Sequence, residues 1–239
     1  MPHRMLQSDE AARYLHLSRA DLDLLVRRNE IPFNRQGERV AFSKKELDSW
    51  ASQRIMGLVD KHLTAYHRTT SSKALDLSAR HTIMSDLIQP SFIATDLKSR
   101  TRASLLRDMV GLAERAGRVM NPADLLTSLR EREELCSTAL PGGIALLHPR
   151  HHDPYMFNES FVAFARTVQG IHFGAADGAS TDLFFLICCQ DDRIHLHVLA
   201  RLCCMCHHTR LLDELRHDED ADALHAAILR AEDEAIKGL

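Results

Sequence analysis

The chain has 239 residues, of which 26% are charged and 45% hydrophobic, and its formal net charge is −3. This length allows one or two domains with buried cores, and the small net charge argues against polyanion binding by the whole chain. The longest apolar runs, such as residues 183–189, fall far short of the ~20 residues that a membrane helix needs. The N-terminus lacks the apolar segment of a secretory signal. We therefore expect a cytoplasmic protein without membrane insertion.

Charge is distributed unevenly along the chain. Residues 1–54 hold ten Lys and Arg against eight Asp and Glu, a net charge of +2, whereas residues 91–239 hold sixteen against twenty-two, a net charge of −6. A mildly basic N-terminal region on an acidic remainder is compatible with nucleic-acid contact through the N-terminal region alone.

The N-terminal region predicts two short helices. Ser8 is expected to cap a helix that runs to Leu15, and Ser18 is expected to cap a second helix over residues 19–28. Pro32 prevents that second helix from continuing.

A small hairpin and a third helix follow. Residues 33–42 read as two short strands with a turn near Gly37. Ser43 is then expected to cap the third helix, and Glu46 three residues later fits a capping box. Two short helices, a two-stranded wing and a third helix describe a winged helix-turn-helix, which we call the head (residues 1–54).

Residues 5–53 resemble the excisionase/MerR-type helix-turn-helix family. The matching segments are residues 10–15, 17–19, 30–32, 35–42 and 45–50. In that family the second helix enters the major groove and the wing contacts the backbone. The resemblance implies DNA phosphate contacts from basic residues, namely Arg19, Arg27, Arg28, Arg35, Arg39, Lys44 and Lys45. Asp21 and Asp23 on the recognition helix would repel phosphates, so a protein-docking role for the head stays an alternative.

Residues 55–82 are expected to form a linker, and residues 83–239 a second domain, which we call the body. The body shows amphipathic helices at about 100–118 and 121–134, then short β-rich runs at 144–147, 161–165, 171–173 and 182–188, then helices at about 195–208 and 218–237. Strands interleaved with helices predict an α/β fold, a mixed sheet with helices on both faces.

Residues 84–237 resemble the enzyme IIA domain of the bacterial phosphotransferase system, in its fructose/mannitol and nitrogen-related branch. One block comprises residues 132–133, 137–138 and 143–148; the other comprises 182–187, 192–196 and 199–202. The chain departs from the family where Leu147 replaces the usual proline before the histidine and Pro141 replaces a turn glycine.

The resemblance implies a phosphoryl site. His148 would accept a phosphoryl group from an HPr-like phosphocarrier protein, and Arg132 would stabilise the transferred group by charge-assisted hydrogen bonds. His195 would bond the phosphoryl group or the first imidazole, and Ser137 and Thr138 would orient the site. A histidine near its unperturbed pKa of ~6.5 is largely neutral and nucleophilic at pH 7, so neither a metal nor a cofactor is required.

The run from Cys203 to His208 has features of a metal site, because Cys203 and Cys206 have C-x-x-C spacing and two histidines follow. The apolar face of the expected helix continues through this run, and buried cysteine behaves as a small hydrophobe. The pattern therefore favours core packing. The six cysteines of the chain fit reduced thiols rather than a disulfide framework.

Together the two resemblances predict a regulator linked to the phosphotransferase system, in which phosphorylation of His148 is coupled to DNA binding by the head. Two alternatives stay open. One is an enzyme IIA relay that passes phosphate to a separate IIB protein. The other is a IIA-like interaction module that is never phosphorylated.

Overall fold

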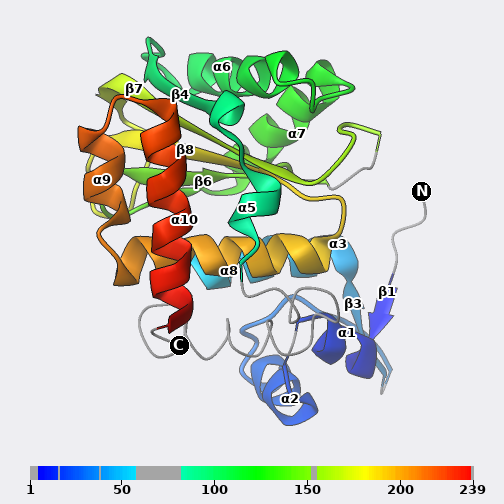
Figure 1. Ribbon diagram of the computed structural model, residues 1–239. Coiled ribbons are helices and arrows are strands. Elements are labelled where there is room, and N and C mark those ends of the chain that lie inside the picture. Colours follow the sequence, from blue (N-terminus) through cyan, green and yellow to red (C-terminus); the bar gives the residue numbers. More distant parts are fainter. Residues whose placement is uncertain (1–4, 16, 38, 58–81, 152–154, 238–239) are drawn as a thin grey trace.

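The computed structural model describes residues 5–15, 17–37, 39–57, 82–151 and 155–237. Figure 1 shows a small head built on a three-stranded sheet and a larger body built on a five-stranded sheet. The predicted α/β fold class is confirmed. Among the described residues, no helix is long and apolar enough to cross a membrane.

The head contains the predicted helices and hairpin and one further strand. Its elements are β1 (Met5–Gln7), α1 (Ser8–Tyr14), α2 (Arg19–Arg27), β2 (Asn34–Gln36), β3 (Arg39–Ser43) and α3 (Lys44–Met56). The strand order is β1-β3-β2, and both pairings are antiparallel. Gly37 has a φ of +62° in the hairpin turn, a conformation that glycine adopts without steric cost.

Ser18 and Ser43 occupy the cap positions predicted for them, whereas Ser8 does not. The Ser18 hydroxyl accepts a hydrogen bond from the Asp21 backbone N–H at 3.1 Å, as expected. Ser8 is instead the first residue of α1, and Gln7 occupies the cap position, with its N–H donating to Glu10 at 2.9 Å. Ser43 occupies the cap position of α3, as predicted, and also ends β3 opposite Met5; the capping box predicted there is wrong, because no side-chain cap bond is described for it.

The body places its elements much as the sequence predicts. They are α5 (Met84–Leu87), a 3-10 turn η1 (Pro90–Phe92), β4 (Ile93–Leu97), α6 (Arg102–Arg115), α7 (Pro122–Leu135), β5 (Ala139–Leu140), β6 (Ile144–Leu147), β7 (Phe161–Ile171), β8 (Thr181–Cys188), α8 (Asp192–His208), α9 (Leu211–His217) and α10 (Ala221–Lys237). Three differences stand out. The strand expected at 161–165 continues to Ile171, the short elements α5, β4 and β5 were not predicted, and a separate helix α9 precedes α10.

The sheet topology brings two distant segments together. The strand order is β4-β7-β8-β6-β5, with β6 parallel to β8. Parallel neighbours end at the same edge of a sheet. The residues that follow β6, beginning with His148, therefore lie beside the start of α8, which follows β8. Helices α6 and α7 lie on one side of this sheet and α8 on the other (Figure 1).

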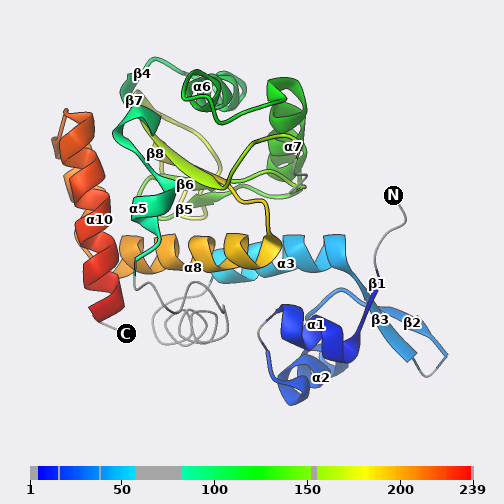
Figure 2. The same ribbon diagram turned by 45° about the vertical axis from the view of Figure 1, so that its right-hand side comes forward.

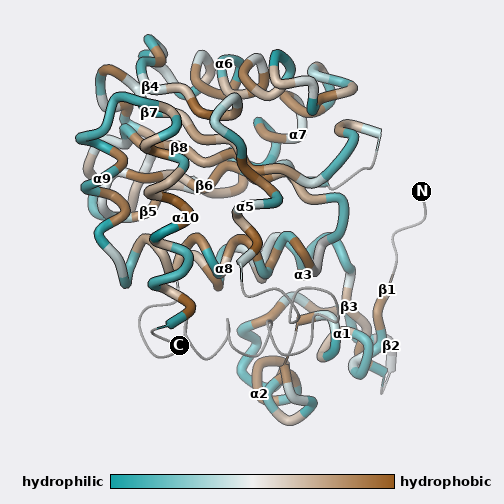
Figure 3. The backbone as a smooth tube through the Cα atoms, in the orientation of Figure 1, coloured by the Kyte–Doolittle hydropathy of each residue, from teal (hydrophilic) through white to brown (hydrophobic). Residues whose placement is uncertain are grey.

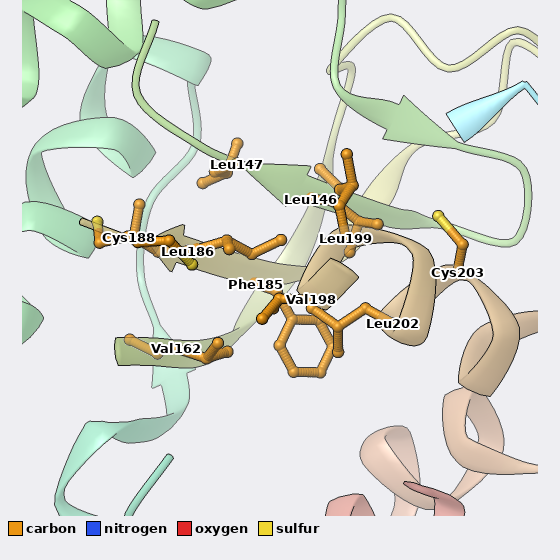
Figure 4. Packing of buried hydrophobic residues seen from close by; sticks show 14 of the residues in the cluster. Leu146, Leu147, Val162, Phe185, Leu186, Cys188, Val198, Leu199, Leu202 and Cys203 are labelled. Atoms are coloured by element: carbon orange, nitrogen blue, oxygen red, sulfur yellow. The ribbon is translucent and has the colours of Figure 1, made fainter. Parts of the chain in front are cut away.

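The apolar core is densest between the central strands and α8. Figure 3 shows that the strands of the body are predominantly hydrophobic. In Figure 4, side chains of β6, β7 and β8 meet Val198, Leu199, Leu202 and Cys203 of α8. Cys203, Cys204 and Met205 are buried, so core packing is confirmed for the first half of this run, whereas His207 and His208 are exposed. Burial raises the pKa of the Cys204 thiol to about 12.

Head and body are in contact through α3, which packs along α8 beneath the sheet (Figure 2). The described part of α3 reaches Met56, two residues beyond the predicted end of the head. Most of the predicted linker, residues 55–82, lies outside the described residues, and the domain boundaries stay a prediction.

Candidate active site

His148 follows directly after β6, and its side chain is only 3% exposed. Its Nδ1 lies 2.9 Å from the carbonyl oxygen of Leu146, and its Nε2 accepts a hydrogen bond from Arg132 Nε at 2.8 Å. A neutral imidazole protonated on Nδ1 satisfies both contacts, because Nδ1–H donates to the carbonyl and Nε2 keeps a lone pair. In this tautomer the nitrogen with the lone pair is Nε2.

Arg132 lies in the last turn of α7 and is 2% exposed. Its Nη1 donates to the backbone carbonyl of Cys136 at 3.0 Å, which holds the guanidinium in place. Its Nη2 is buried and makes no hydrogen bond with the described residues. A buried donor of this kind is normally satisfied, so Nη2 is available to an anion that enters the site.

His195 lies in the first turn of α8 and is 2% exposed. Its ring centroid is 4.8 Å from that of His148, with the ring planes at 47°. The structure thus brings together three of the residues that the sequence predicts for the site, His148, Arg132 and His195. Two neighbouring imidazoles and a guanidinium that bonds one of them form a cluster whose chemistry suits a phosphoryl group.

Ser137 and Thr138 lie on the loop between α7 and β5, and the described hydrogen bonds that their hydroxyl groups donate go to residues other than His148. The Ser137 hydroxyl donates to the carbonyl of Phe173 at 2.7 Å. The Thr138 hydroxyl donates to the buried carboxylate of Glu133. Both residues hold the loop that follows Arg132, while a direct role for either at the phosphoryl group stays a prediction.

Glu133 makes the stability of this loop depend on pH. Burial raises the pKa of the Glu133 carboxyl above its ordinary value of 4.5, against the opposing effect of the Thr138 hydrogen bond. A raised carboxyl pKa means that the folded state binds the proton more tightly than the unfolded state, so this contribution to stability is lost as pH rises through the raised pKa.

We expect Glu133→Gln to gain stability relative to the native chain between pH 4 and pH 7.5, as measured by urea unfolding at both values. Glu134→Gln, at the exposed neighbouring position, is the control. If the free energy of unfolding of Glu133→Gln differed from that of the native chain by the same amount at both pH values, the expectation would be contradicted.

The structure adds residues of the head to this site, which the sequence did not predict. The Ser52 hydroxyl of α3 lies 3.4 Å from His195 Nε2. Gln53 Nε2 lies 3.1 Å from the sulfur of Cys136, the residue whose carbonyl holds Arg132. Ser52 and His195 are 143 residues apart, and helical periodicity carries no information on such a contact. The one local signal is a serine among the apolar positions of α3.

A cavity of about 730 Å³ lies beside this contact, between head and body. Trp50 and Lys45 of α3 line it from the head, and Leu135 and Arg150 line it from the body. The lone tryptophan of the chain is therefore placed at the boundary between the two parts.

The basic residues predicted to contact DNA are divided between two environments. Five are exposed, namely Arg19, Arg27, Arg28, Arg35 and Arg39. Arg19 is held in ion pairs with Asp9 at 2.6 Å and Asp23 at 3.0 Å. Lys44 lies over the Tyr14 ring, and Lys45 lines the cavity that faces the body.

Comparison with known families matches both parts of the chain. Residues 86–231 match the family described as phosphoenolpyruvate-dependent sugar phosphotransferase system, EIIA 2, and residues 5–55 match a helix-turn-helix domain. The chain is 24% identical over 143 residues to the fructose-specific EIIABC component of Bacillus subtilis. The aligned region covers 59% of this chain but only 22% of that protein. It is 29% identical over 123 residues to the fructose-specific EIIA component of Haloferax volcanii, covering 51% of this chain and 78% of that protein.

Solved structures give the same fold for the body. The nitrogen regulatory protein IIA-Ntr of Neisseria meningitidis aligns with a TM-score of 0.56 at 26% identity, covering 62% of this chain and 99% of that one. The mannitol IIA protein of Escherichia coli aligns with a TM-score of 0.52 at 20% identity over 59% of this chain and 98% of that one. The same mannitol IIA protein in complex with phosphorylated IIB aligns with a TM-score of 0.52 at 19% identity, over 59% of this chain and 96% of that one. Because the EIIA 2 match spans more than half of the residues, the chain belongs to the EIIA 2 family of the phosphoenolpyruvate-dependent sugar phosphotransferase system, and it carries a helix-turn-helix domain in front of the EIIA domain.

Proposed function

We propose that this chain is a cytoplasmic regulator that accepts a phosphoryl group on His148 Nε2 and couples this event to DNA binding by its head. The observation that carries the proposal is the environment of Nε2. The Leu146 carbonyl fixes the proton on Nδ1, Arg132 bonds the other nitrogen, and the His195 ring lies beside the His148 ring.

The transfer itself needs little from the protein beyond positioning and charge. His148 Nε2 attacks the phosphorus of a phosphorylated carrier protein, a new N–P bond forms, and the bond between phosphorus and the carrier breaks with its electron pair left on the carrier. Arg132 Nε must release Nε2 for this attack. Its N–H groups then face the phosphoryl oxygens, with Nη2 already without a partner among the described residues. His195 adds a second imidazole, with its ring centroid 4.8 Å from that of His148.

The helix-turn-helix head gives this phosphorylation a regulatory rather than a transport role. Its exposed arginines on α2 and the wing are the groups that would contact DNA phosphates. A phosphohistidine adds nearly two negative charges to the body, which is enough to change how head and body interact.

A relay to a separate IIB protein is the second candidate. It is supported by the Escherichia coli mannitol IIA protein, which has been solved with phosphorylated IIB. In that case the phosphoryl group would leave His148 as soon as a IIB protein is supplied.

The test is incubation of the full chain with phosphoenolpyruvate, enzyme I and a phosphocarrier, followed by mapping of the phosphorylated residue. We expect one phosphoryl group, on His148, and none in His148→Ala. DNA binding of the phosphorylated and unphosphorylated chain should then differ, while His148→Ala should respond to no donor. Identical DNA affinity of both forms would refute the coupling. If no donor labelled His148, the remaining function would be that of an interaction module that is never phosphorylated.

A further inference from the structure

The phosphoacceptor pocket of the body is covered by the head. From this contact we infer that helix α3 occupies the surface on which the phosphoryl donor must dock, so that a docked head and phosphoryl transfer exclude each other. This inference rests on the proposed function, because it describes how access to His148 is controlled.

Two described contacts from α3 reach the site at different points. Ser52 is 3% exposed and its hydroxyl lies 3.4 Å from His195 Nε2. Gln53, the next residue, contacts the sulfur of Cys136 at 3.1 Å. Cys136 in turn holds Arg132 through its carbonyl. Helix α3 therefore touches the environment of both groups that flank His148.

Transfer requires space that this arrangement does not provide. A phosphoryl donor must place its phosphorus about 3 Å from the attacking nitrogen and in line with the bond that breaks. The donor is itself a protein, and a protein surface must come with the phosphoryl group. His148, His195 and Arg132 are all buried in the full chain, so a donor cannot approach Nε2 while α3 stays on α8.

The contact of α3 with the body also disfavours the phosphorylated form of His148. A phosphoryl group carries almost two negative charges and three acceptor oxygens. Burial of these charges beneath Ser52 would cost several kcal/mol unless each oxygen were bonded. Release of α3 returns the group to water, so phosphorylation and an undocked head favour each other by linkage.

The docked arrangement leaves the recognition helix free. Both Figure 1 and Figure 2 show α2 on the far side of the head from the body, and its residues Arg27 and Arg28 are exposed. The contact thus covers the phosphoacceptor pocket rather than the predicted DNA-reading surface.

Two variants of α3 test whether the docked helix blocks access of the phosphoryl donor to His148. Ser52→Glu places a longer, charged side chain in the buried contact, whereas Arg54→Glu places the same side chain at an exposed position of α3. We expect Ser52→Glu to be phosphorylated on His148 at least tenfold faster than Arg54→Glu at limiting phosphocarrier, since each 1.4 kcal/mol of docking free energy corresponds to tenfold in the accessible population. Equal rates for the two variants would overturn the inference.

A reversible lock provides a test that does not depend on a disruptive variant. In Gln53→Cys, a short bis-thiosulfonate reagent can join the new thiol to Cys136 across the contact. The crosslinked chain should resist phosphorylation, and reduction of the crosslink should restore the rate. The native chain treated with the same reagent is the control, because only Cys136 of that contact is then modified. Normal phosphorylation of the crosslinked chain would contradict the cover and leave the proposed function intact, whereas failure of every form to be labelled on His148 would refute the proposed function itself.

Discussion

Replacement of Arg132 by glutamine is expected to slow phosphorylation of His148 by about 10²- to 10³-fold, the range found when one preorganised donor is removed from a site where charge develops. The guanidinium is fixed by the Cys136 carbonyl and already contacts the attacking nitrogen at 2.8 Å. Glutamine is shorter and uncharged, so it can neither hold Nε2 nor face the phosphoryl oxygens. The single-turnover rate of phosphohistidine formation from a labelled phosphocarrier measures this effect.

Two comparisons separate a role in transfer from a role in folding. Arg130→Gln makes the same change at an exposed position of α7, two residues earlier, and should leave the rate unchanged. Arg132→Lys keeps the charge but loses the planar pair of donors, so it should give an intermediate rate. A rate for Arg132→Gln within threefold of Arg130→Gln would refute the assigned role.

Glu232→Gln is expected to destabilise the body by about 3–5 kcal/mol, the cost of breaking a buried ion pair by removing one partner. Glu232 of α10 is 0% exposed and binds Arg201 of α8 at 2.6 Å. Its two oxygens also accept the backbone N–H groups of Ile83 and Met84, both at 2.9 Å. A glutamine offers one acceptor and one donor, so one backbone N–H would face another donor and Arg201 would lose its carboxylate.

Urea unfolding followed by far-ultraviolet circular dichroism measures this loss. Glu234→Gln, on an exposed position of the same helix, is the control and should stay within about 0.5 kcal/mol of the native chain. An equal unfolding midpoint for Glu232→Gln and Glu234→Gln would show that the buried pair does not stabilise the body.

Local patterns in the sequence predict most of the elements correctly. The hydrophobic periodicity of α6 and α7 sets both helices to within a few residues, because this signal lies within one segment. The capping box at Ser43 failed for the opposite reason. Ser43 keeps the cap position of α3, but it also pairs with Met5 in the sheet, and this tertiary contact is not encoded in the local pattern.

The candidate site divides in the same way. His148, Arg132 and His195 could be proposed because a family resemblance supplies what sequence separation hides. The parallel pairing of β6 with β8 then explains physically why they meet. The contact of Ser52 with His195 had no such help, since it depends on how two separately patterned parts of the chain pack together.

Trp50 offers the most direct test of the link between phosphorylation and the head. It is the only tryptophan of the chain, and it lines the cavity between head and body together with Leu135 and Arg150. If phosphorylation of His148 releases α3, Trp50 moves away from the body into water and its fluorescence emission should move to longer wavelength. The same treatment should leave the emission of His148→Ala unchanged. Complete phosphorylation of His148 with no change in Trp50 emission would contradict the account.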